Sequence, residues 1–252
     1  MLHLNNIRKQ FGEKVAVDVA DFTVHQSDIL GLVGNNGAGK TTLFRLILDL
    51  LKADEGKVQL THRLPAENPS ANDAERMTVT IDPSESEEWK IFTGAYIDDG
   101  FLIDFLTPDE YFAFIGQVSG VSESDVDTRL QPYMAFMADE IVGQKKLIRD
   151  LSAGNKQKVG IVAALLNEPE LLILDEPFNF LDPTSQHQLK RILSDYHLRT
   201  QATILVSSHN LDHTVDISTR IALMENGQII QDLDNKDKQA TETLTHYFNV
   251  DR

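Results

Sequence analysis

Hydrophobic and polar residues alternate through the first two segments of the chain, LHLNNI (2–7) and VAVDVADFTV (15–24). Alternation of this kind predicts strands that bury one face. ILGLV, from Ile29 to Val33, is apolar at every position, which predicts a strand buried on both faces. After a loop, KTTLFRLILDLL predicts a helix that ends near Lys52, with its apolar side formed by Leu43, Phe44, Ile47, Leu50 and Leu51.

The pattern changes between Leu60 and Asp104, where proline, asparagine, serine and acidic residues dominate and MTVTI is a single strand-like island. We interpret this part, chiefly residues 61–91, as an exposed and partly irregular acidic insertion. The alternative is a solvated acidic face without a role of its own. Two helical segments follow, TPDEYFAFIGQVSG and ESDVDTRLQPYMAFMADEIV, and they predict a helical subdomain over about 107–164.

Short β-rich runs and amphipathic helices alternate again from Leu171 onward, so the chain as a whole predicts an α/β fold with a mostly parallel sheet. The sequence shows no internal repeat and no long linker. With 252 residues, 41% of them hydrophobic, it predicts a single domain over 1–252. Residues 1–106 and 165–252 are expected to form the core and the β-rich part, around the helical subdomain.

The net charge of the chain limits the kinds of partner that it can bind. Lys and Arg number 23 and Asp and Glu number 39, a net charge of −16, which repels nucleic acid over most of the surface and argues against a nucleic-acid-binding role. Without cysteine there is no disulfide framework and no thiolate metal site, which fits a cytosolic enzyme. The sequence has neither a signal peptide at its start nor a run of about 18 apolar residues, so we expect a soluble chain.

The strongest chemical signal is GNNGAGKTT (34–42), which matches the pattern G-x-x-x-x-G-K-[ST] between an apolar strand and a helix. Such a phosphate loop directs backbone N–H groups and the positive end of a helix at phosphates. We predict that Lys40 contacts the β- and γ-phosphates of ATP, that Thr41 binds Mg²⁺ and that Thr42 reaches the α-phosphate. The alternative is a glycine turn beside an ordinary surface lysine. Further ATP contacts are predicted for Gly34, Asn35, Asn36, Gly37, Ala38 and Gly39.

A second motif, LLILDEPFNFLDP (171–183), places two carboxylates directly after a buried strand. Alternation along the strand is expected to turn Asp175 and Glu176 to opposite sides. Asp175 is then the predicted Mg²⁺ ligand, through water, and Glu176 the residue that polarises the attacking water. The alternative is a polar turn that ends the strand.

These motifs, together with LSAGNKQKVG, NFLDP and LVSSH, occur in the order and spacing of the nucleotide-binding subunits of ABC transporters, which the chain resembles over nearly its whole length. The resemblance implies a P-loop NTPase fold of ABC type, with an antiparallel β subdomain beside the parallel core and the helical subdomain. It also implies two ATPase domains that dimerise head to tail, so that the signature segment LSAGN (151–155) completes the nucleotide site of the partner. A hydroxyl, a close backbone approach and a helix N-terminus suit that role.

In the signature segment, Ser152 and Gly154 match the family, whereas Ala153 and Asn155 depart from its usual Leu-Ser-Gly-Gly-Gln. We expect this departure to alter affinity more than to abolish activity. Ser152 also has the simpler interpretation of a helix N-cap. Both roles are compatible, because a cap and an anion site use the same N–H groups.

Further residues take their roles from the resemblance. His209 corresponds to the switch histidine that contacts the γ-phosphate, and Asp182 to a residue of the dimer interface that is also a candidate N-cap before Pro183. Phe11 resembles the aromatic residue that stacks on adenine, with a strand-end core aromatic as the alternative. Where the family commonly has a glutamine that contacts Mg²⁺, this chain has Asp98, or Asp99 in a shifted alignment, and either carboxylate is also a candidate turn former.

The resemblance implies an ATP-hydrolysing transport subunit, peripheral on the cytoplasmic face of a membrane. It works with a separate permease, whose cytoplasmic helix it receives near the helical subdomain and Asp98, and with a second copy of itself or a paralogous ATPase. Export rather than import is favoured by the residues found in the motifs NNGAGKTT and DEPFNFLDP and by the absence of an importer-style C-terminal domain. The alternatives are a soluble ABC ATPase acting in assembly and a regulatory module without hydrolysis, and the presence of Lys40, Asp175, Glu176 and His209 weakens the latter.

Overall fold

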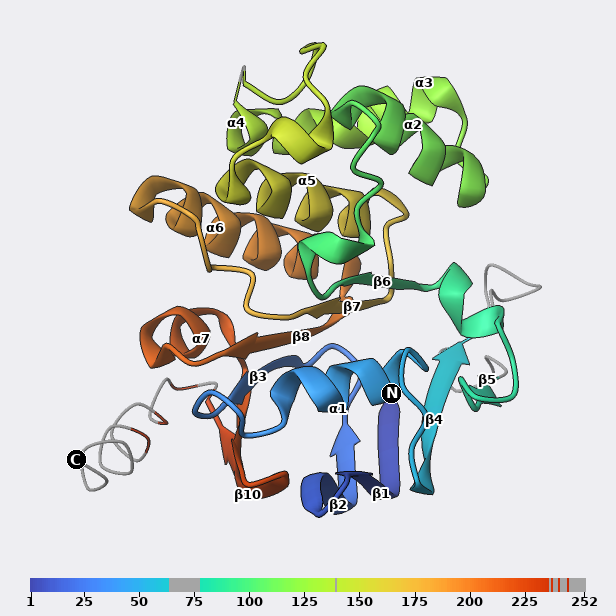
Figure 1. The fold of residues 1–252 in the computed structure, drawn as a ribbon, viewed down its shortest axis with the longest axis vertical. Coiled ribbons are helices and arrows are strands. Elements are labelled where there is room, and N and C mark those ends of the chain that lie inside the picture. The colour runs from blue at the N-terminus through green and yellow to red at the C-terminus, as the bar shows by residue number, and fades with distance from the viewer. Residues whose placement is uncertain (64–77, 139, 236, 238–239, 241–243, 245–252) are drawn as a thin grey trace.

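The computed structural model describes residues 1–63, 78–138, 140–235, 237, 240 and 244, and its centre is a six-stranded sheet (Figure 1). The strand order is β10-β9-β3-β8-β7-β6, parallel except for β10. β3, β7 and β8 are buried at every position, as the continuous apolar segments predict. The strands of this sheet are β3 (Ile29–Val33), β6 (Thr93–Tyr96), β7 (Leu171–Leu174), β8 (Thr203–Ser208), β9 (Arg220–Glu225) and β10 (Gln228–Asp234).

A second sheet is antiparallel, with the order β2-β1-β4-β5. Its strands alternate between buried and exposed residues where the first two predicted strands lie, because only one face packs on the core. The predicted antiparallel β subdomain is therefore confirmed. Its strands are β1 (Leu2–Phe11), β2 (Lys14–Val24), β4 (Glu55–Arg63) and β5 (Thr78–Ile81).

The parallel sheet separates two hydrophobic cores. On β7, Leu172 and Leu174 join a core with α5 and α6, whereas Leu171 and Ile173 join a core with α1 and the antiparallel sheet. In Figure 1, α2, α3 and α4 lie at the opposite end of the molecule from β1, β2 and β4. The helices are α1 (Lys40–Ile47), α2 (Pro108–Val118), α3 (Glu123–Leu130), α4 (Met134–Met137), α5 (Ala153–Leu166), α6 (Pro183–Thr200) and α7 (Leu211–Ile217).

Short 3₁₀ turns complete the chain between these elements. They are η2 (Glu88–Ile91), η3 (Asp99–Phe101), η4 (Gln131–Tyr133) and η5 (Ile148–Asp150). Among the residues that the structure describes, no helix has the combination of length and apolar character that crossing a bilayer requires.

Helix α5 carries the signature segment at its start and lies against β6. A Cβ atom on Gly160 would lie 2.0 Å from the ring of Tyr96, so only glycine allows this helix to approach the strand so closely. The hydroxyl of Tyr96 donates a hydrogen bond to the side-chain oxygen of Gln157 on the same helix (3.2 Å). This packing fixes the helical subdomain to the edge of the parallel sheet.

Two predictions of element bounds are wrong. Helix α1 ends at Ile47 rather than near Lys52, because Asp49 takes a left-handed φ of 50° that breaks the helix, and Leu50 is exposed. The stretch interpreted as an exposed insertion (61–91) contains the buried Trp89, and β6, a strand of the main sheet, follows directly after it in the region that ends at Asp104. β6 (TGAY) escaped notice because it has four residues with little apolar character. Residues 64–77 of the predicted insertion lie outside the described residues.

Candidate functional site

The phosphate loop follows β3 and leads into α1, as its sequence predicts. Gly37 and Gly39 have φ values of 83° and 112°, which favour glycine. A Cβ atom on Gly39 would lie 2.4 Å from the carbonyl oxygen of Ala16, and one on Gly34 would lie 2.2 Å from that of Met224. The first turn of α1 has neither a side-chain cap nor an acidic residue, so its N–H groups are available to an anion.

Lys40 lies back over this loop and is buried. Its ammonium donates to the carbonyl oxygens of Gly34 (2.7 Å) and Asn35 (3.3 Å), and it lies 3.4 Å from Glu176 Oε1. A positive charge is thereby held against two carbonyl oxygens of the loop and a carboxylate. Phosphate oxygens can replace these acceptors at little cost, because they are stronger hydrogen-bond partners for an ammonium group.

Asp175 and Thr41 meet at the other side of the loop. Thr41 Oγ1 donates to Asp175 Oδ2 (2.5 Å), and the hydroxyl of Ser207 donates to Asp175 Oδ1. Burial raises the pKa of Asp175, and the nearby charge of Glu176 raises it further, whereas the hydrogen bonds from Ser207 and Thr41 lower it. A buried carboxylate beside a hydroxyl provides the hard oxygen ligands that Mg²⁺ prefers. The two predicted metal ligands on these elements therefore fit the ion.

Among the described residues, no group of three or more His, Cys, Asp or Glu side chains is arranged to hold a metal ion by itself. A metal at Thr41 and Asp175 thus needs ligands from outside the protein. Nucleotide phosphates and water supply such ligands to Mg²⁺ in phosphoryl-transfer sites.

Glu176 lies between two groups that can carry positive charge. Its Oε2 accepts hydrogen bonds from His209 through Nδ1 (2.8 Å) and the backbone N–H (3.3 Å), and its Oε1 faces Lys40. The structure therefore brings together the three predicted catalytic residues. They come from the ends of β7 and β8 and from the start of α1, at the carboxyl end of the parallel strands.

Asp175 and Glu176 point apart for a different reason from the one predicted. The strand β7 ends at Leu174, and Glu176, although it precedes Pro177, has a φ of 46°. The left-handed region is unusual for a non-glycine residue and costs free energy. A tight turn, rather than strand alternation, thus separates the two carboxylates.

Two residues outside the predicted set hold this turn. Ser207 accepts a hydrogen bond from the backbone N–H of Glu176 (2.8 Å), and the amide of Gln157 donates to the carbonyl oxygen of Glu176 (3.2 Å). Both side chains are buried. For Ser207 the available signal in the sequence was a polar residue after an apolar run in a strand, which marks a buried group that needs a partner, whereas Gln157 stands among polar residues and gives no such signal.

The structure places Asp98 near the site but directs its carboxylate elsewhere. Asp98 accepts hydrogen bonds from Arg45 (3.0 Å) and from the backbone N–H of Gly100 (2.9 Å), where it caps η3, so its expected turn-forming role is present. Asp99 lies 3.9 Å from the ammonium of Lys156. One cavity of about 190 Å³ brings both residues together with the catalytic end of the site; its lining includes Asp98, Asp99, Ala153, Asp175, Glu176 and Phe180.

The signature segment is exposed at Ser152 and Ala153. Ser152 caps α5 by accepting a hydrogen bond from the N–H of Asn155 (3.2 Å), so the simpler interpretation of this serine is confirmed. A Cβ atom on Gly154 would lie 2.7 Å from the carbonyl oxygen of Phe180. The glycine is thus required by the contact between the signature segment and the loop that follows β7, within one chain.

Asp182 and Phe11 lie apart from this cluster. The carboxylate of Asp182 caps α6 by accepting from the N–H groups of Thr184 (2.9 Å) and Ser185 (3.0 Å), and hydrogen bonds to Ser185 and Thr184 lower its pKa. The ring of Phe11 is 52% exposed, with the ammonium of Lys9 5.7 Å from its centre. The interpretation of Phe11 as a core aromatic is therefore wrong, and the ring is free to stack on a ligand.

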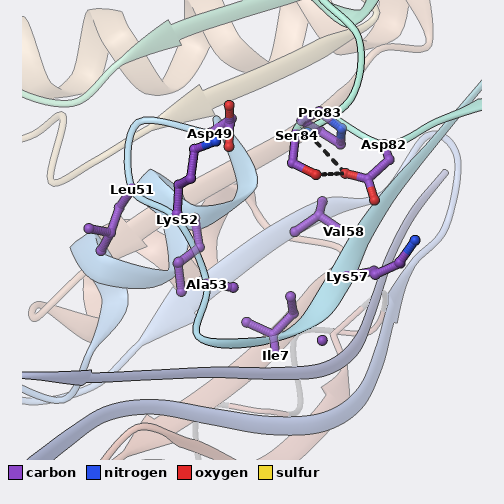
Figure 2. Close-up of a pocket in the computed structure, with 12 residues that line it drawn as sticks. Ile7, Asp49, Leu51, Lys52, Ala53, Lys57, Val58, Asp82, Pro83 and Ser84 are labelled. Atoms are coloured by element: carbon purple, nitrogen blue, oxygen red, sulfur yellow. Dashed lines mark hydrogen bonds between the residues drawn. The ribbon is translucent and has the colours of Figure 1, made fainter.

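A separate cavity of about 240 Å³ lies between the end of α1, β4 and a turn at Asp82 (Figure 2). Lys52 and Lys57 line it, and the carboxylate of Asp82 accepts hydrogen bonds from the hydroxyl (2.7 Å) and N–H (2.9 Å) of Ser84. No residue predicted to bind nucleotide lines this cavity. Its chemistry is not part of the site described above.

A family model described as ABC transporter matches residues 17–179. The chain belongs to the ABC transporter family. Bacitracin transport ATP-binding protein BcrA of Enterococcus faecalis is 32% identical to this ABC chain over 238 residues, which cover 92% of the chain and 69% of BcrA. Methionine import ATP-binding protein MetN of Streptococcus agalactiae serotype III (strain NEM316) is 31% identical over 240 residues, which cover 92% of the chain and 64% of MetN.

The fold of this ABC chain matches that of solved ATP-binding cassettes. The dimeric, post-hydrolysis structure of the cassette MJ0796, bound to ADP and Pi, has a TM-score of 0.75 and 22% identity, and the match covers 93% of the chain and 98% of the cassette. The resemblance to ABC ATP-binding subunits and the predicted P-loop ATPase fold are therefore confirmed. ABC proteins of this kind bind ATP, hydrolyse it as their general reaction, and work with transmembrane permease subunits.

Proposed function

We propose that this chain hydrolyses Mg-ATP at a site completed by a second ATPase subunit, and that closure of the pair drives export through a separate permease. The observation that supports this most directly is the meeting of Lys40, Glu176 and His209 at the end of the parallel sheet. A cation, a carboxylate and an imidazole in contact are the groups that phosphoryl transfer to water requires.

In the proposed reaction, Lys40 exchanges its contacts with Gly34 O and Asn35 O for oxygens of the β- and γ-phosphates. Glu176 accepts a proton from the attacking water as the new bond to the γ-phosphorus forms and the bond to the β-phosphate oxygen breaks. His209 orients this carboxylate through its Nδ1 contact and stabilises charge on the γ-phosphate. The products are ADP and phosphate.

Thr41 and Asp175 hold Mg²⁺ in this proposal, the hydroxyl directly and the carboxylate through water. Bound Mg²⁺ neutralises charge on the phosphates. Asp98 is proposed as a further contact to the ion; its carboxylate then leaves Arg45 and Gly100. Phe11 stacks on the adenine. The remaining phosphate contacts come from the phosphate loop, through Gly34, Asn35, Asn36, Gly37, Ala38, Gly39 and Thr42.

Ser152, Ala153, Gly154 and Asn155 are proposed to act on the nucleotide of the partner subunit, which is a second copy of this chain or a paralogous ATPase. The exposure of Ser152 and Ala153 at the start of α5 supports this, because the N-terminus of a helix attracts phosphate. Asp182, one loop away, is proposed to link the two sites across the interface. Two composite sites then close on two ATP molecules and open after hydrolysis.

The permease is proposed to dock beside the Asp98 loop, and the chain to be peripheral on the cytoplasmic face of the membrane. A cavity of about 320 Å³ lies there between the end of α1 and β6, and its lining includes Trp89, Ala95, Ile97 and Phe101. Phe101 is 51% exposed, so an apolar helix has a surface to contact. Ile97 lines both this cavity and the catalytic cavity, and it directly precedes Asp98. A docked helix that moves Ile97 therefore also moves Asp98 in the catalytic cavity.

Replacing Glu176 with glutamine tests the hydrolytic role. Glu176→Gln keeps the shape of the side chain but cannot take a proton, so we expect turnover to fall by about 100-fold or more. Bound ATP should then hold a dimer in size-exclusion chromatography. Ser152→Ala should slow hydrolysis with nucleotide binding largely intact. A monomer of Glu176→Gln at saturating Mg-ATP contradicts the composite site, and equal loss of binding in Ser152→Ala contradicts its action across the interface.

Isolation of the protein from its native cells in a mild detergent, followed by mass spectrometry, tests the transport role. We expect a stoichiometric membrane protein with several spans, and Phe101→Asp should release it. Transport assays with that partner in vesicles decide between export and import. If only soluble proteins accompany the chain, the assembly-factor alternative replaces the transport role.

A further inference from the structure

Phe180 combines two features that seldom occur in one residue. Its side chain is 74% exposed, and its φ is 62°, in the left-handed region. A bulky residue in that region is strained, and a large aromatic side chain in water forgoes the gain from burial. Neither the exposed ring nor the left-handed backbone helps the isolated chain to fold. A contact with another molecule accounts for both features.

The loop that carries Phe180, residues 175–182 between β7 and α6, is firmly held. The amide of Gln186 donates to the carbonyl oxygens of Phe178 (3.2 Å) and Leu181 (3.1 Å). The side chains of Phe178 and Leu181 are buried on either side. The exposure of Phe180 is therefore a fixed property of the β7–α6 loop, which directs this one apolar side chain outward.

The neighbours of Phe180 place it on a particular face of the molecule. Its carbonyl oxygen packs on Gly154, and the exposed Ser152 and Ala153 lie directly before that glycine. Asp182, also exposed, follows two residues later in the loop. The backbone of Phe180 therefore lies beside the signature segment and close in sequence to the proposed interface aspartate.

We propose that Phe180 is an aromatic anchor of the ATP-bound dimer and buries its ring against the phosphate loop of a second copy of this chain. This inference rests on the proposed function, which places the neighbouring signature segment against that loop. Asn35, Asn36 and Gly37 are exposed there, and a Cβ atom on Gly37 would meet nothing within 4 Å. A glycine with open space above it offers a flat surface to an aromatic ring.

A second copy suits this residue better than the permease does. In a two-fold dimer both copies present the same surface, so one Phe180 creates two symmetric contacts. Rigid aromatic residues are the side chains that most often dominate an interface. The proposed permease surface at Phe101 lies on another cavity, whose lining does not include Phe180.

Dimer affinity measured in the Glu176→Gln background tests the anchor. At saturating Mg-ATP we expect Phe180→Ala and Phe180→Gly each to raise the dissociation constant of the dimer about 10- to 30-fold, the size of an interface hot spot. Leu198→Ala is the matched control, because Leu198 is 72% exposed and lies near the end of α6, at the opposite end of that helix from Asp182, and it should leave the constant unchanged. ATP affinity, measured at protein concentrations below dimer formation, should change less than about twofold in all variants.

The possible results separate this inference from the proposed function. Weaker dimers in both Phe180 variants, with an unchanged control, support the anchor. If all three variants dimerise as tightly as the Glu176→Gln protein in which they are made, Phe180 is not an anchor of the dimer, and the proposed function is unaffected. Equal weakening by Leu198→Ala also overturns it, since general loss of apolar surface then explains the effect. A parent that stays monomeric overturns the composite site itself.

The absence of cysteine from the sequence allows a second, positional test. In the Glu176→Gln background, the pair Phe180→Cys and Asn36→Cys should form a disulfide between two chains under mild oxidation, and only with Mg-ATP present. Each single cysteine variant is the control and should stay uncross-linked. ATP-dependent cross-linking of the pair supports contact with the phosphate loop, and its absence in a confirmed dimer overturns that placement.

Discussion

The phosphate loop and the β7–α6 loop both contain residues with left-handed φ angles, but different residue types adopt these angles in the two loops. In the phosphate loop the left-handed residues are Gly37 and Gly39. In the β7–α6 loop they are Glu176 and Phe180, which carry side chains and are strained there. The first loop therefore owes its shape to its own composition, whereas the second needs support from elsewhere.

That support comes from side chains that are distant in the sequence. Ser207 on β8 and Gln157 on α5 hold the backbone of Glu176, and Gln186 on α6 holds the end of the loop. Each of these hydrogen bonds crosses from another element to a loop backbone. The comparison teaches that the loop carrying Glu176 depends on side chains of other elements, among them Gln157 of the helical subdomain, while the left-handed angles of the phosphate loop fall on its own glycines.

The largest effect should come from Gly39→Ala. The new methyl group meets the carbonyl oxygen of Ala16 at 2.4 Å with φ at 112°, so strain and overpacking combine. We expect a loss of about 3 kcal/mol of stability, a melting temperature lower by roughly 6–12 °C, and loss of ATP binding.

Gly37→Ala is the control for Gly39→Ala, because φ is 83° but the space around it is open. Strain alone should cost about 1 kcal/mol. Thermal unfolding followed by circular dichroism measures both variants. Equal melting temperatures would show that contact with Ala16 plays no part and that the loop conformation alone matters.

The same contrast explains what the sequence could predict. The phosphate loop was identified completely, because glycine spacing between a strand and a helix encodes its shape locally. The roles proposed for Asp175 and Glu176 also rest on one segment. The turn at Glu176, the support from Ser207 and Gln157, and the strand β6 were missed, since each depends on contacts between distant segments. Likewise, exposure of Phe11 depends on how β1 packs, which its position at a strand end left open.

Removing Ser207 tests the support of the second loop. Ser207→Ala leaves the N–H of Glu176 without its partner and takes a hydrogen bond from Asp175, so we expect turnover to fall about 10- to 100-fold with ATP binding retained. Steady-state hydrolysis measures the effect. Ser218→Ala is the matched control, because the hydroxyl of Ser218 is also buried but has no hydrogen-bond partner among the described residues.

The pH profile gives a second measure of the same variant. Burial raises the pKa of Asp175, and the bond from Ser207 opposes that rise. Deleting the bond should raise the pKa further, so that Asp175 becomes protonated, and unable to hold Mg²⁺, at a higher pH. The acidic limb of the activity profile should therefore move to higher pH. A limb that stays in place, or moves down, contradicts the assignment of Asp175.

A smaller effect is expected from Gln157→Met, which preserves side-chain length but not the amide. The carbonyl oxygen of Glu176 then loses one of its two donors, the other being the N–H of Asn179 (3.1 Å). We expect kcat to fall about 3- to 10-fold with KM unchanged, because the residue positions Glu176 without touching substrate.

Gln188→Met controls for the loss of a glutamine, since Gln188 is half-buried and its amide donates to the carbonyl oxygen of Ala135 (3.5 Å), a residue outside the proposed site. In the Glu176→Gln background, Gln157→Met should have no further effect on turnover, because the two residues act as one unit. Additive losses would instead point to a general structural role of Gln157.

The smallest expected effect concerns the strain at Phe180 itself. Glycine accepts a φ of 62° without steric cost, whereas alanine does not, so Phe180→Gly should be more stable than Phe180→Ala by about 0.5–1 kcal/mol, or roughly 1–4 °C in melting temperature. Glycine is therefore favoured over alanine here as it is at position 37, where φ is also positive. Melting of the nucleotide-free monomers measures the difference, so that dimer contacts play no part. If Phe180→Ala melts at the higher temperature, the position is not strained in solution, and the β7–α6 loop relaxes to a shape in which its neighbours no longer fix the ring.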